Sequence, residues 1–257
     1  MTASESHASG ENVPGDEIEA LVSDIPGWLS PQEGRLLYDL ARGAPDHGCI
    51  VEIGSWQGRS TIWLAAGSRG GRGARVVAVD PHRGSRLHAE GEDTELALRT
   101  NLESAGVSDQ VDVLVATSRE AAAGWTRPIS LLWIDGDHAY ESVKEDFLLW
   151  EEHLLDGGIV ALHDTLYWDG PARVVSELLQ RRRTFSDLGF VDTITFATKR
   201  QDPTVVQMLR KRKAVLHRHV YAIRADAAPD RFRLVALLDS IARLRRVGQR
   251  RRGVRDR

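Results

Sequence analysis

The stretch Cys49-Ile-Val-Glu-Ile-Gly-Ser-Trp-Gln-Gly-Arg-Ser60 decides the fold, because it predicts a strand, a glycine turn and the start of a helix in that order. Residues 50–53 contain the β-branched side chains that are typical of a strand buried on both faces. Gly54 and Gly58 then mark the turn, and a helical sequence begins at Ser60. A strand, turn and helix N-terminus of this kind form a cradle for an anionic or nucleotide-like ligand.

The acid at Glu52 narrows the choice of ligand. A dinucleotide-binding turn has three glycines, which let its backbone press against a pyrophosphate. The turn here carries only Gly54 and Gly58 and lacks the third glycine. A carboxylate at the end of the strand suits a ligand with a positive charge or several hydrogen-bond donors, which favours S-adenosylmethionine over a dinucleotide. A purely structural glycine turn after a core strand would have the same sequence, so further residues have to decide.

The second predicted strand, residues 75–80, also ends in an acid. Asp80 follows Gly54 by 26 residues, close to the roughly 20 that separate a nucleotide-binding turn from the acid that binds a ribose. An aspartate before Pro81 is ordinary turn chemistry as well. The pairing of this acid with Glu52 favours the ribose role.

Strands and helices alternate along the rest of the domain. Strands are expected at residues 111–116, 129–134, 159–162 and 190–198. Ser118, just after the first of these, could reach an adenine or take part in the cap of the next helix. The alternation predicts an α/β fold with a doubly wound, mostly parallel sheet.

A helical preface precedes the sheet. Ser30-Pro31-Gln32-Glu33 is a capping box with proline at the first helical position, and it opens a helix that Gly43 closes. The whole chain then divides into a disordered tail (1–15), the helical preface (16–44), the α/β domain (45–200) and a basic helical extension (201–257).

Aspartates and histidines cluster after two consecutive predicted strands. The first cluster is Asp135, Asp137 and His138, and the second is His163 and Asp164. We call them the acidic clusters. Neighbouring strands lie about 4.8 Å apart, so the two clusters would share one small space at the carboxyl edge of the sheet. Uncompensated carboxylates repel, and a divalent cation such as Mg²⁺ or Mn²⁺ would remove the conflict. Alternatively, the two acids Asp137 and Asp164 only cap turns and helices, and the histidines bond to the backbone.

Four segments together resemble the class I S-adenosylmethionine-dependent methyltransferases: residues 51–61, 79–81, 134–140 and 157–164. The resemblance is greatest to the branch that contains the metal-dependent O-methyltransferases of antibiotic sugars and the cephalosporin-hydroxylase-like proteins. It covers about residues 25–198 and implies a seven-stranded Rossmann-like sheet whose last strand is antiparallel.

The resemblance also implies roles for the residues of these segments. The cofactor S-adenosylmethionine would be bound by Glu52, Gly54, Ser55, Gly58, Ser60, Asp80, Ser118 and Asp135. By the resemblance, Asp135 and Asp164 would be metal ligands and Asp137 the candidate base. To these we add His163 as a third metal ligand, and His138 and His163 as further candidate catalytic residues. The antibiotic-sugar branch has a second acid where this chain has His163, which leaves open whether the metal is kept, exchanged or lost.

The implied reaction is methyl transfer from the sulfonium to a hydroxyl of a small natural product or its sugar. A metal would hold the acceptor oxygen and lower its pKa, while Asp137, or else His138 or His163, would remove the proton. One alternative is a nucleotide-dependent oxidoreductase, which the missing third glycine disfavours. A second is an RNA-binding protein or RNA methyltransferase that uses the basic end of the chain.

The net charge of −3 is unevenly distributed. From Lys199 onward there are 18 Lys and Arg against 5 Asp and Glu, whereas the preceding residues carry 16 against 32. The single Cys49 excludes a disulfide within the chain and fits a reducing compartment. No apolar run approaches the roughly 20 residues of a membrane span, and the first residues lack the apolar region of a signal peptide. We therefore expect a cytoplasmic protein without a membrane partner.

The basic extension has an apolar stripe of helical period, formed by Leu234, Leu237, Leu238, Ile241 and Leu244. Arginines adjoin the stripe, but no aromatic residues alternate with them for base stacking, so a nucleic-acid partner is disfavoured. We predict that residues 203–246 form helices that pack on the domain or across a homodimer.

Overall fold

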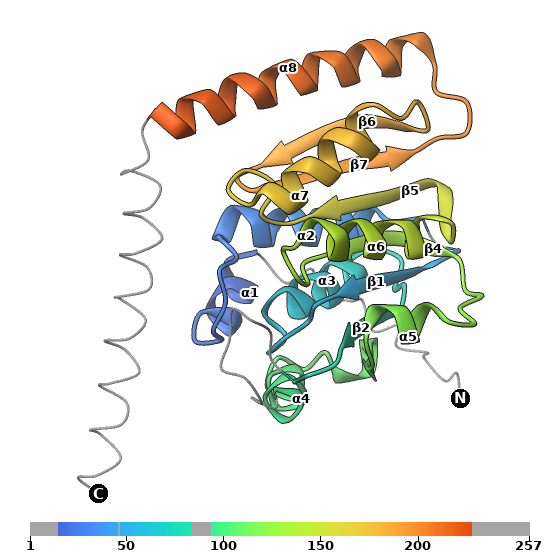
Figure 1. The fold of residues 1–257 in the computed structure, drawn as a ribbon. Helices are drawn as coiled ribbons and strands as arrows, with labels where there is room; N and C mark the ends of the chain where they lie inside the picture. Colours follow the sequence, from blue (N-terminus) through green and yellow to red (C-terminus); the bar gives the residue numbers. More distant parts are fainter. Residues whose placement is uncertain (1–14, 46, 84–93, 228–257) are drawn as a thin grey trace, which may run out of the picture. The chain divides into compact units, whose positions relative to one another are not determined.

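One seven-stranded sheet forms the centre of the α/β domain (Figure 1). The computed structural model describes residues 15–45, 47–83 and 94–227. The strands are β1 (Cys49–Ile53), β2 (Val76–Asp80), β3 (Val111–Val115), β4 (Ile129–Ile134), β5 (Leu154–Leu162), β6 (Phe185–Val191) and β7 (Ile194–Lys199). They lie in the order β3-β2-β1-β4-β5-β7-β6, with β1 to β5 parallel and β7 antiparallel to both of its neighbours. The predicted mostly parallel, doubly wound fold is confirmed.

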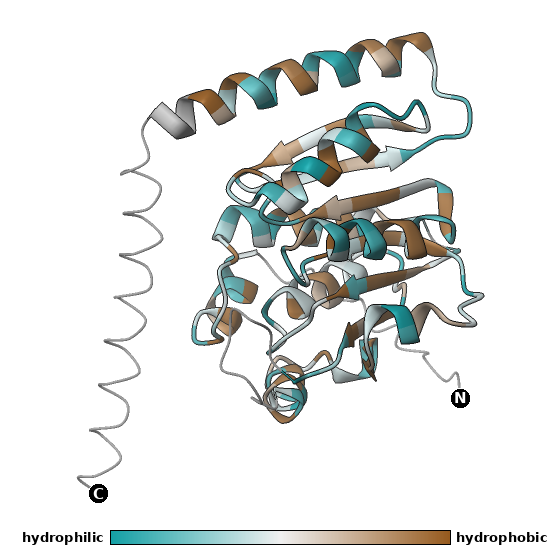
Figure 2. Ribbon diagram, in the orientation of Figure 1, coloured by the Kyte–Doolittle hydropathy of each residue, from teal (hydrophilic) through white to brown (hydrophobic). Residues whose placement is uncertain are grey.

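Helices cover both faces of this sheet (Figure 1). They are α1 (Gly15–Val22), α2 (Pro31–Gly43), α3 (Arg59–Arg69), α4 (Glu95–Ser104), η1 (Ser108–Gln110), α5 (Ser118–Ala122), α6 (Tyr140–Glu151), α7 (Asp169–Val174), its π-helical continuation η2 (Val175–Gln180) and α8 (Val205–Ala227). Helices α1 to α4 share one core cluster with alternate strand residues such as Ile50, Leu131 and Trp133. The strands are accordingly the most hydrophobic part of the domain (Figure 2).

Helix α2 begins where the sequence predicts. The Ser30 hydroxyl accepts a hydrogen bond from the Glu33 N–H, the Glu33 carboxylate accepts one from the Ser30 N–H, and Pro31 is the first helical residue. Behind it, α2 and α3 approach very closely, because a Cβ on Gly67 would lie only 2.3 Å from the carbonyl oxygen of Tyr38. This close packing fixes α2 against the domain.

Two strands differ from the predictions. Strand β5 begins at Leu154 rather than at residue 159, because Gly157 takes a φ of +87° and lets a bulged strand extend backwards. The strand expected at residues 190–198 is a hairpin of β6 and β7 that turns at Asp192. Its alternating pattern hides the turn, since both arms have the period of a strand.

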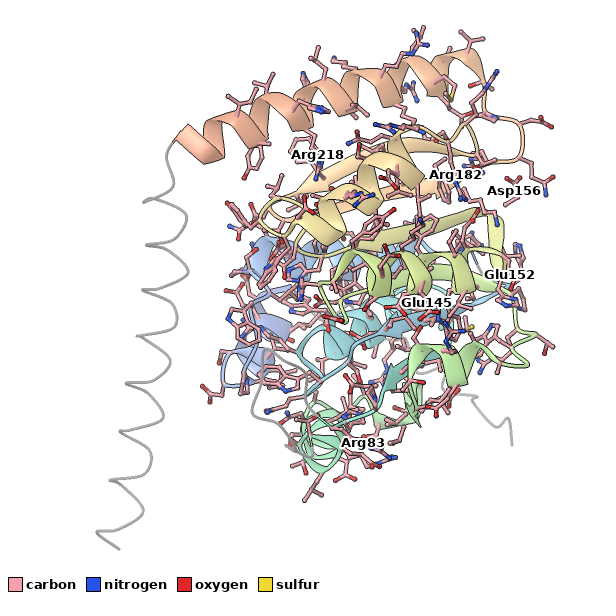
Figure 3. The ribbon with its side chains drawn as sticks, in the orientation of Figure 1. Arg83, Glu145, Glu152, Asp156, Arg182 and Arg218 are labelled. Carbon is pink, nitrogen blue, oxygen red and sulfur yellow. The ribbon has the colours of Figure 1, made fainter. Side chains whose placement is uncertain are left out.

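The described part of the basic extension is helix α8, which confirms the predicted helix over residues 205–227. The chain divides into two compact units at Lys211 and Arg212. Within the first unit, the ammonium of Lys211 donates hydrogen bonds to the carbonyl oxygens of Arg182 (labelled in Figure 3) and Phe185, which anchors the first turns of α8. The apolar stripe at residues 234–244 lies outside the described residues, and so does the predicted tail (1–15) except for Gly15, which begins α1.

Among the described helices, none has the length and the apolar character that crossing a membrane requires.

Candidate active site

The turn between β1 and α3 has an unusual backbone. Gly54 and Gly58 both take positive φ values, 87° and 89°, and so does Trp56 at 43°. A Cβ on Gly54 would lie 2.4 Å from the carbonyl oxygen of Asp135, so only glycine lets this turn lie against the end of β4. A residue with a side chain rarely adopts a positive φ like that of Trp56, and backbone strain of this kind concentrates at functional sites.

Asp80 holds the neighbouring turns together. One carboxylate oxygen accepts a hydrogen bond of 2.9 Å from the N–H of Trp56, and the other accepts one of 2.7 Å from the N–H of His82. His82 is itself buried, with its ring nitrogen Nδ1 2.9 Å from the Thr94 hydroxyl. The acid that we expect to bind a ribose therefore stands at the end of β2, beside the glycine turn.

Glu52 is hydrogen-bonded to the first turn of α3. It is completely buried, and its two carboxylate oxygens accept hydrogen bonds from the hydroxyls of Ser60 and Thr61 at 2.5 and 2.6 Å. Burial raises the pKa of Glu52 to about 8, against the effect of these two bonds. The structure thus ties Glu52 and Ser60, both expected to contact the cofactor, to each other, and Thr61 joins them although the sequence analysis did not single it out.

The other predicted cofactor residues have different surroundings. Ser55 is buried in the turn. Gly58 packs so closely that a Cβ would lie 2.6 Å from a methyl group of Leu98. Ser118 begins α5, and its hydroxyl accepts a hydrogen bond of 2.9 Å from the Trp150 indole. Its side chain is thereby held by α6.

The acidic clusters after β4 and β5 do converge at the carboxyl edge of the sheet. Asp135, His138 and Asp164 each offer a ligand atom, and these atoms lie within 4.8 Å of one another. His138 Nε2 is 2.8 Å from a carboxylate oxygen of Asp164, and its ring packs on that of Trp168 at 4.7 Å between centroids. Asp164 has a φ of +55°, a conformation that aspartate tolerates better than most residues.

His163, which we expected to be a metal ligand with Asp135 and Asp164, is buried in the protein. The histidine that lies with these two acids is His138. The His163 ring is 5% exposed, with Nδ1 2.9 Å from a carboxylate oxygen of Asp135 and Nε2 3.5 Å from one of Glu33. Burial alone would lower the pKa of His163, but the surrounding carboxylates outweigh it and raise this pKa well above its usual value. Burial also raises the pKa of Asp135, which His163 opposes.

Asp137 is not one of the three residues whose ligand atoms lie together, and its carboxylate caps the start of α6. Its carboxylate accepts hydrogen bonds from the N–H groups of His138 and Ala139 and from the Ser142 hydroxyl. Although burial alone would raise it, these bonds hold the pKa of Asp137 below its usual value.

Two residues of the site were missed by the sequence analysis in this role. Glu33 was recognised only as part of a capping box, and nothing in the spacing indicates that it reaches His163. Trp168 follows Asp164 by four residues, and a tryptophan so close in sequence to the second acidic cluster is a signal that could have been used. In the structure, 42% of its surface is exposed.

The comparisons with known proteins agree with this arrangement. A family model described as a methyltransferase domain matches residues 51–165. The catechol O-methyltransferase of Mycobacterium tuberculosis (strain ATCC 25618 / H37Rv) is 33% identical over 171 residues, which cover 63% of this chain and 68% of that protein.

Solved structures have the same fold. A methyltransferase from Geobacter sulfurreducens is 25% identical, with a TM-score of 0.51, over 73% of this chain and 87% of its own. The O-methyltransferase TomG of Streptomyces achromogenes, involved in tomaymycin synthesis and solved with S-adenosylmethionine, is 20% identical, with a TM-score of 0.52, over 78% and 92%.

The matched segment begins in β1 and ends after Asp164, so it includes the glycine turn, Asp80 and both acidic clusters. The family resemblance that the sequence indicates is therefore confirmed, and a nucleotide-dependent oxidoreductase is set aside. This chain belongs to the class I S-adenosylmethionine-dependent O-methyltransferases.

Proposed function

We propose that the protein transfers the methyl group of S-adenosylmethionine to a hydroxyl of a small natural product, with a divalent metal held by Asp135, His138 and Asp164. One observation carries this proposal. The glycine turn lies directly against Asp135, so a cofactor held by the turn would be next to the acidic group.

The donor set fits a divalent cation. Carboxylate oxygens suit Mg²⁺ and Mn²⁺, and the His138 imidazole shifts the preference toward Mn²⁺ and other first-row ions. Without a cation, the two carboxylates depend on His163 and His138 for their compensation. A bound cation would supply a Lewis acid that lowers the pKa of the acceptor hydroxyl.

The chain's own residues divide the remaining work. Asp80 and the turn at Gly54 would bind and orient the cofactor, with Glu52 supporting the turn from below. Asp137 would accept the proton of the acceptor hydroxyl at its carboxylate, since its lowered pKa keeps it ionised at neutral pH. His138 could take this role only if it were not a metal ligand.

The acceptor would be a hydroxylated ring. Tyr167 and Trp168 expose 52% and 42% of their surface, and Trp168 packs on His138. An exposed aromatic face next to the metal group suits the face of an aromatic ring or a sugar. The name of the mycobacterial relative, a catechol O-methyltransferase, supports an acceptor with neighbouring hydroxyls.

We further propose that the extension makes the protein a homodimer. Along α8, Val205, Leu209, Leu216, Val220 and Ile223 are exposed and repeat with helical spacing. The strongly basic extension of one copy and the acidic remainder of a second copy have complementary charge. We therefore propose that a second copy of the chain covers these exposed apolar residues of α8.

Methyl transfer should require the metal. We expect a panel of catechols and sugars to be methylated with Mn²⁺ or Mg²⁺ and not in excess EDTA, with activity returning when the ion is restored. The variant Asp164→Asn should lose binding of Mn²⁺ but keep binding of S-adenosylhomocysteine, both measured by calorimetry, whereas Glu103→Gln on exposed α4 should change neither. Unchanged turnover in EDTA would refute the metal requirement, and the acidic group would then be an acid–base site without a metal.

A further inference from the structure

We propose that Glu33, in the first turn of α2, is a positioning residue of the active site that acts on Asp135 through His163. The inference rests on the proposed metal group. It adds a residue more than 100 positions away in the sequence from the acids that it orients.

The environment of Glu33 exceeds what a helix cap needs. Its carboxylate is 2% exposed, whereas the capping box requires only the hydrogen bond of 2.8 Å that it accepts from the Ser30 N–H. The other oxygen accepts two more bonds, from the N–H and the hydroxyl of Thr193, at 2.9 and 2.6 Å. A buried carboxylate is costly unless it is hydrogen-bonded and paired with a charge, and the only cation within pairing distance among the described residues is His163.

The His163 ring is held between carboxylates on both sides. Nε2 faces Glu33 at 3.5 Å, while Nδ1 lies 2.9 Å from Asp135 and 3.5 Å from Asp164. With one nitrogen directed at each side, the plane of the ring is fixed, and a rotated ring would present carbon to a carboxylate. The charge of Glu33, at 3.5 Å from Nε2, would therefore help to hold His163 in the orientation that directs Nδ1 at Asp135.

The orientation of His163 in turn sets that of Asp135. His163 Nδ1 engages one carboxylate oxygen of Asp135, which determines where the second oxygen points. Groups that orient a metal ligand in this way typically change metal affinity or activity about 10–100-fold when they are removed. Glu33 would thus act on the metal group without touching it.

The substitution Glu33→Gln tests this role, because it keeps the shape of the side chain and an acceptor for Thr193 but removes the charge that faces His163. We expect it to weaken Mn²⁺ binding about 10–100-fold in calorimetry with S-adenosylhomocysteine present. The matched control is Ser30→Ala, which breaks the same capping box and the bond from Ser30 to Asp192 but leaves Glu33 and His163 in place. It should change the affinity less than twofold.

A double variant shows whether the effect passes through His163. Asparagine at this position keeps a donor close to where Nδ1 reaches Asp135 and removes the side that faces Glu33. If Glu33 acts through the ring, Glu33→Gln should have no further effect on Mn²⁺ binding in the His163→Asn background. An undiminished effect in that background would overturn the proposal.

The ring of His163 can also be observed without metal. In protein labelled with ¹⁵N-histidine, the His163 ring resonances should move in Glu33→Gln and stay in place in Ser30→Ala. If the wild type binds no Mn²⁺, the proposed function is wrong, and this spectrum alone decides the role of Glu33. If the His163 resonances do not move in Glu33→Gln, the positioning role is refuted whatever the metal does.

Discussion

Glu52 is a carboxyl group placed where a carboxylate is least stable. It has no exposed surface, and its partners are two hydroxyls rather than a cation. Burial raises its pKa to about 8 from an ordinary value of 4.5, so in the folded protein this group keeps its proton at neutral pH. A neutral Glu52 can itself donate a hydrogen bond, which suits a support for the turn better than a contact for a cationic ligand.

The pH dependence of stability should report this proton. Between pH 4.5 and 8 the folded state holds a proton on Glu52 that the unfolded state has released, so stability falls as pH rises through this window. The variant Glu52→Gln should abolish this pH-dependent loss of stability, which is on the order of 5 kcal/mol over the whole window. Urea unfolding at several pH values measures the slope, and the exposed variant Glu103→Gln is the control. Equal slopes for Glu52→Gln and wild type would mean that Glu52 is ionised.

The sequence was sufficient to predict which residues gather at the carboxyl edge but not how each side chain is turned. Asp135 and Asp164 follow adjacent parallel strands, so topology alone brings them together. Whether His138 or His163 joins them depends on rotamers, and one of the carboxylates that face the His163 ring is Glu33, in a helix distant in sequence.

Helices α2 and α3 pack with almost no space between their backbones. One of the small residues at this crossing is Gly67, whose hydrogen faces the carbonyl oxygen of Tyr38. The crossing is buried against the sheet, since Trp63 and Leu64 of α3 are almost completely inaccessible. Such a contact sets the distance between α3 and α2, the helix that carries Glu33.

A single methyl group should disturb this crossing. Gly67→Ala places a Cβ 2.3 Å from backbone that cannot rotate away, and we expect a loss of about 1–3 kcal/mol in the free energy of unfolding. Gly43→Ala at the end of α2 is the matched control, because its Cβ would meet nothing within 4 Å. It should be neutral or slightly stabilising by helix propensity. Equal stability of the two variants would show that α2 can shift freely.

At the level of elements, local signals were reliable where they have a local cause. The capping box of α2 depends only on Ser30, Glu33 and the proline between them, and the structure reproduces it. The early start of β5 and the hairpin of β6 and β7 depend on pairing with strands that are distant in sequence. Periodicity within one strand carries no information on such pairing.

The basic extension should determine whether the protein is a monomer or a homodimer in solution. The double variant Leu216→Asp and Ile223→Asp puts charges into the exposed stripe of α8, and light scattering should then give the mass of one chain instead of two. His217→Asp, exposed but outside the stripe, should leave the mass unchanged.

A second comparison separates self-association from RNA binding. A chain ending at Asp230 lacks 10 of the 14 arginines of the basic extension (201–257), and we expect only weak, salt-sensitive RNA binding with or without them. Loss of tight RNA binding at physiological salt on truncation, with an unchanged mass, would favour the nucleic-acid alternative.

The hydrogen bonds from Ser30 to Asp192 and from Thr193 to Glu33 join positions about 160 residues apart. A growing chain leaves the ribosome from its N-terminus, so α2 emerges long before the hairpin that satisfies its buried carboxylate. Until β7 has been synthesised, Glu33 has neither Thr193 nor a settled His163 as a partner. The group of Asp135, His138 and Asp164 should therefore reach its final arrangement only after the β6–β7 hairpin has been synthesised and has paired with α2, late in the folding of the domain.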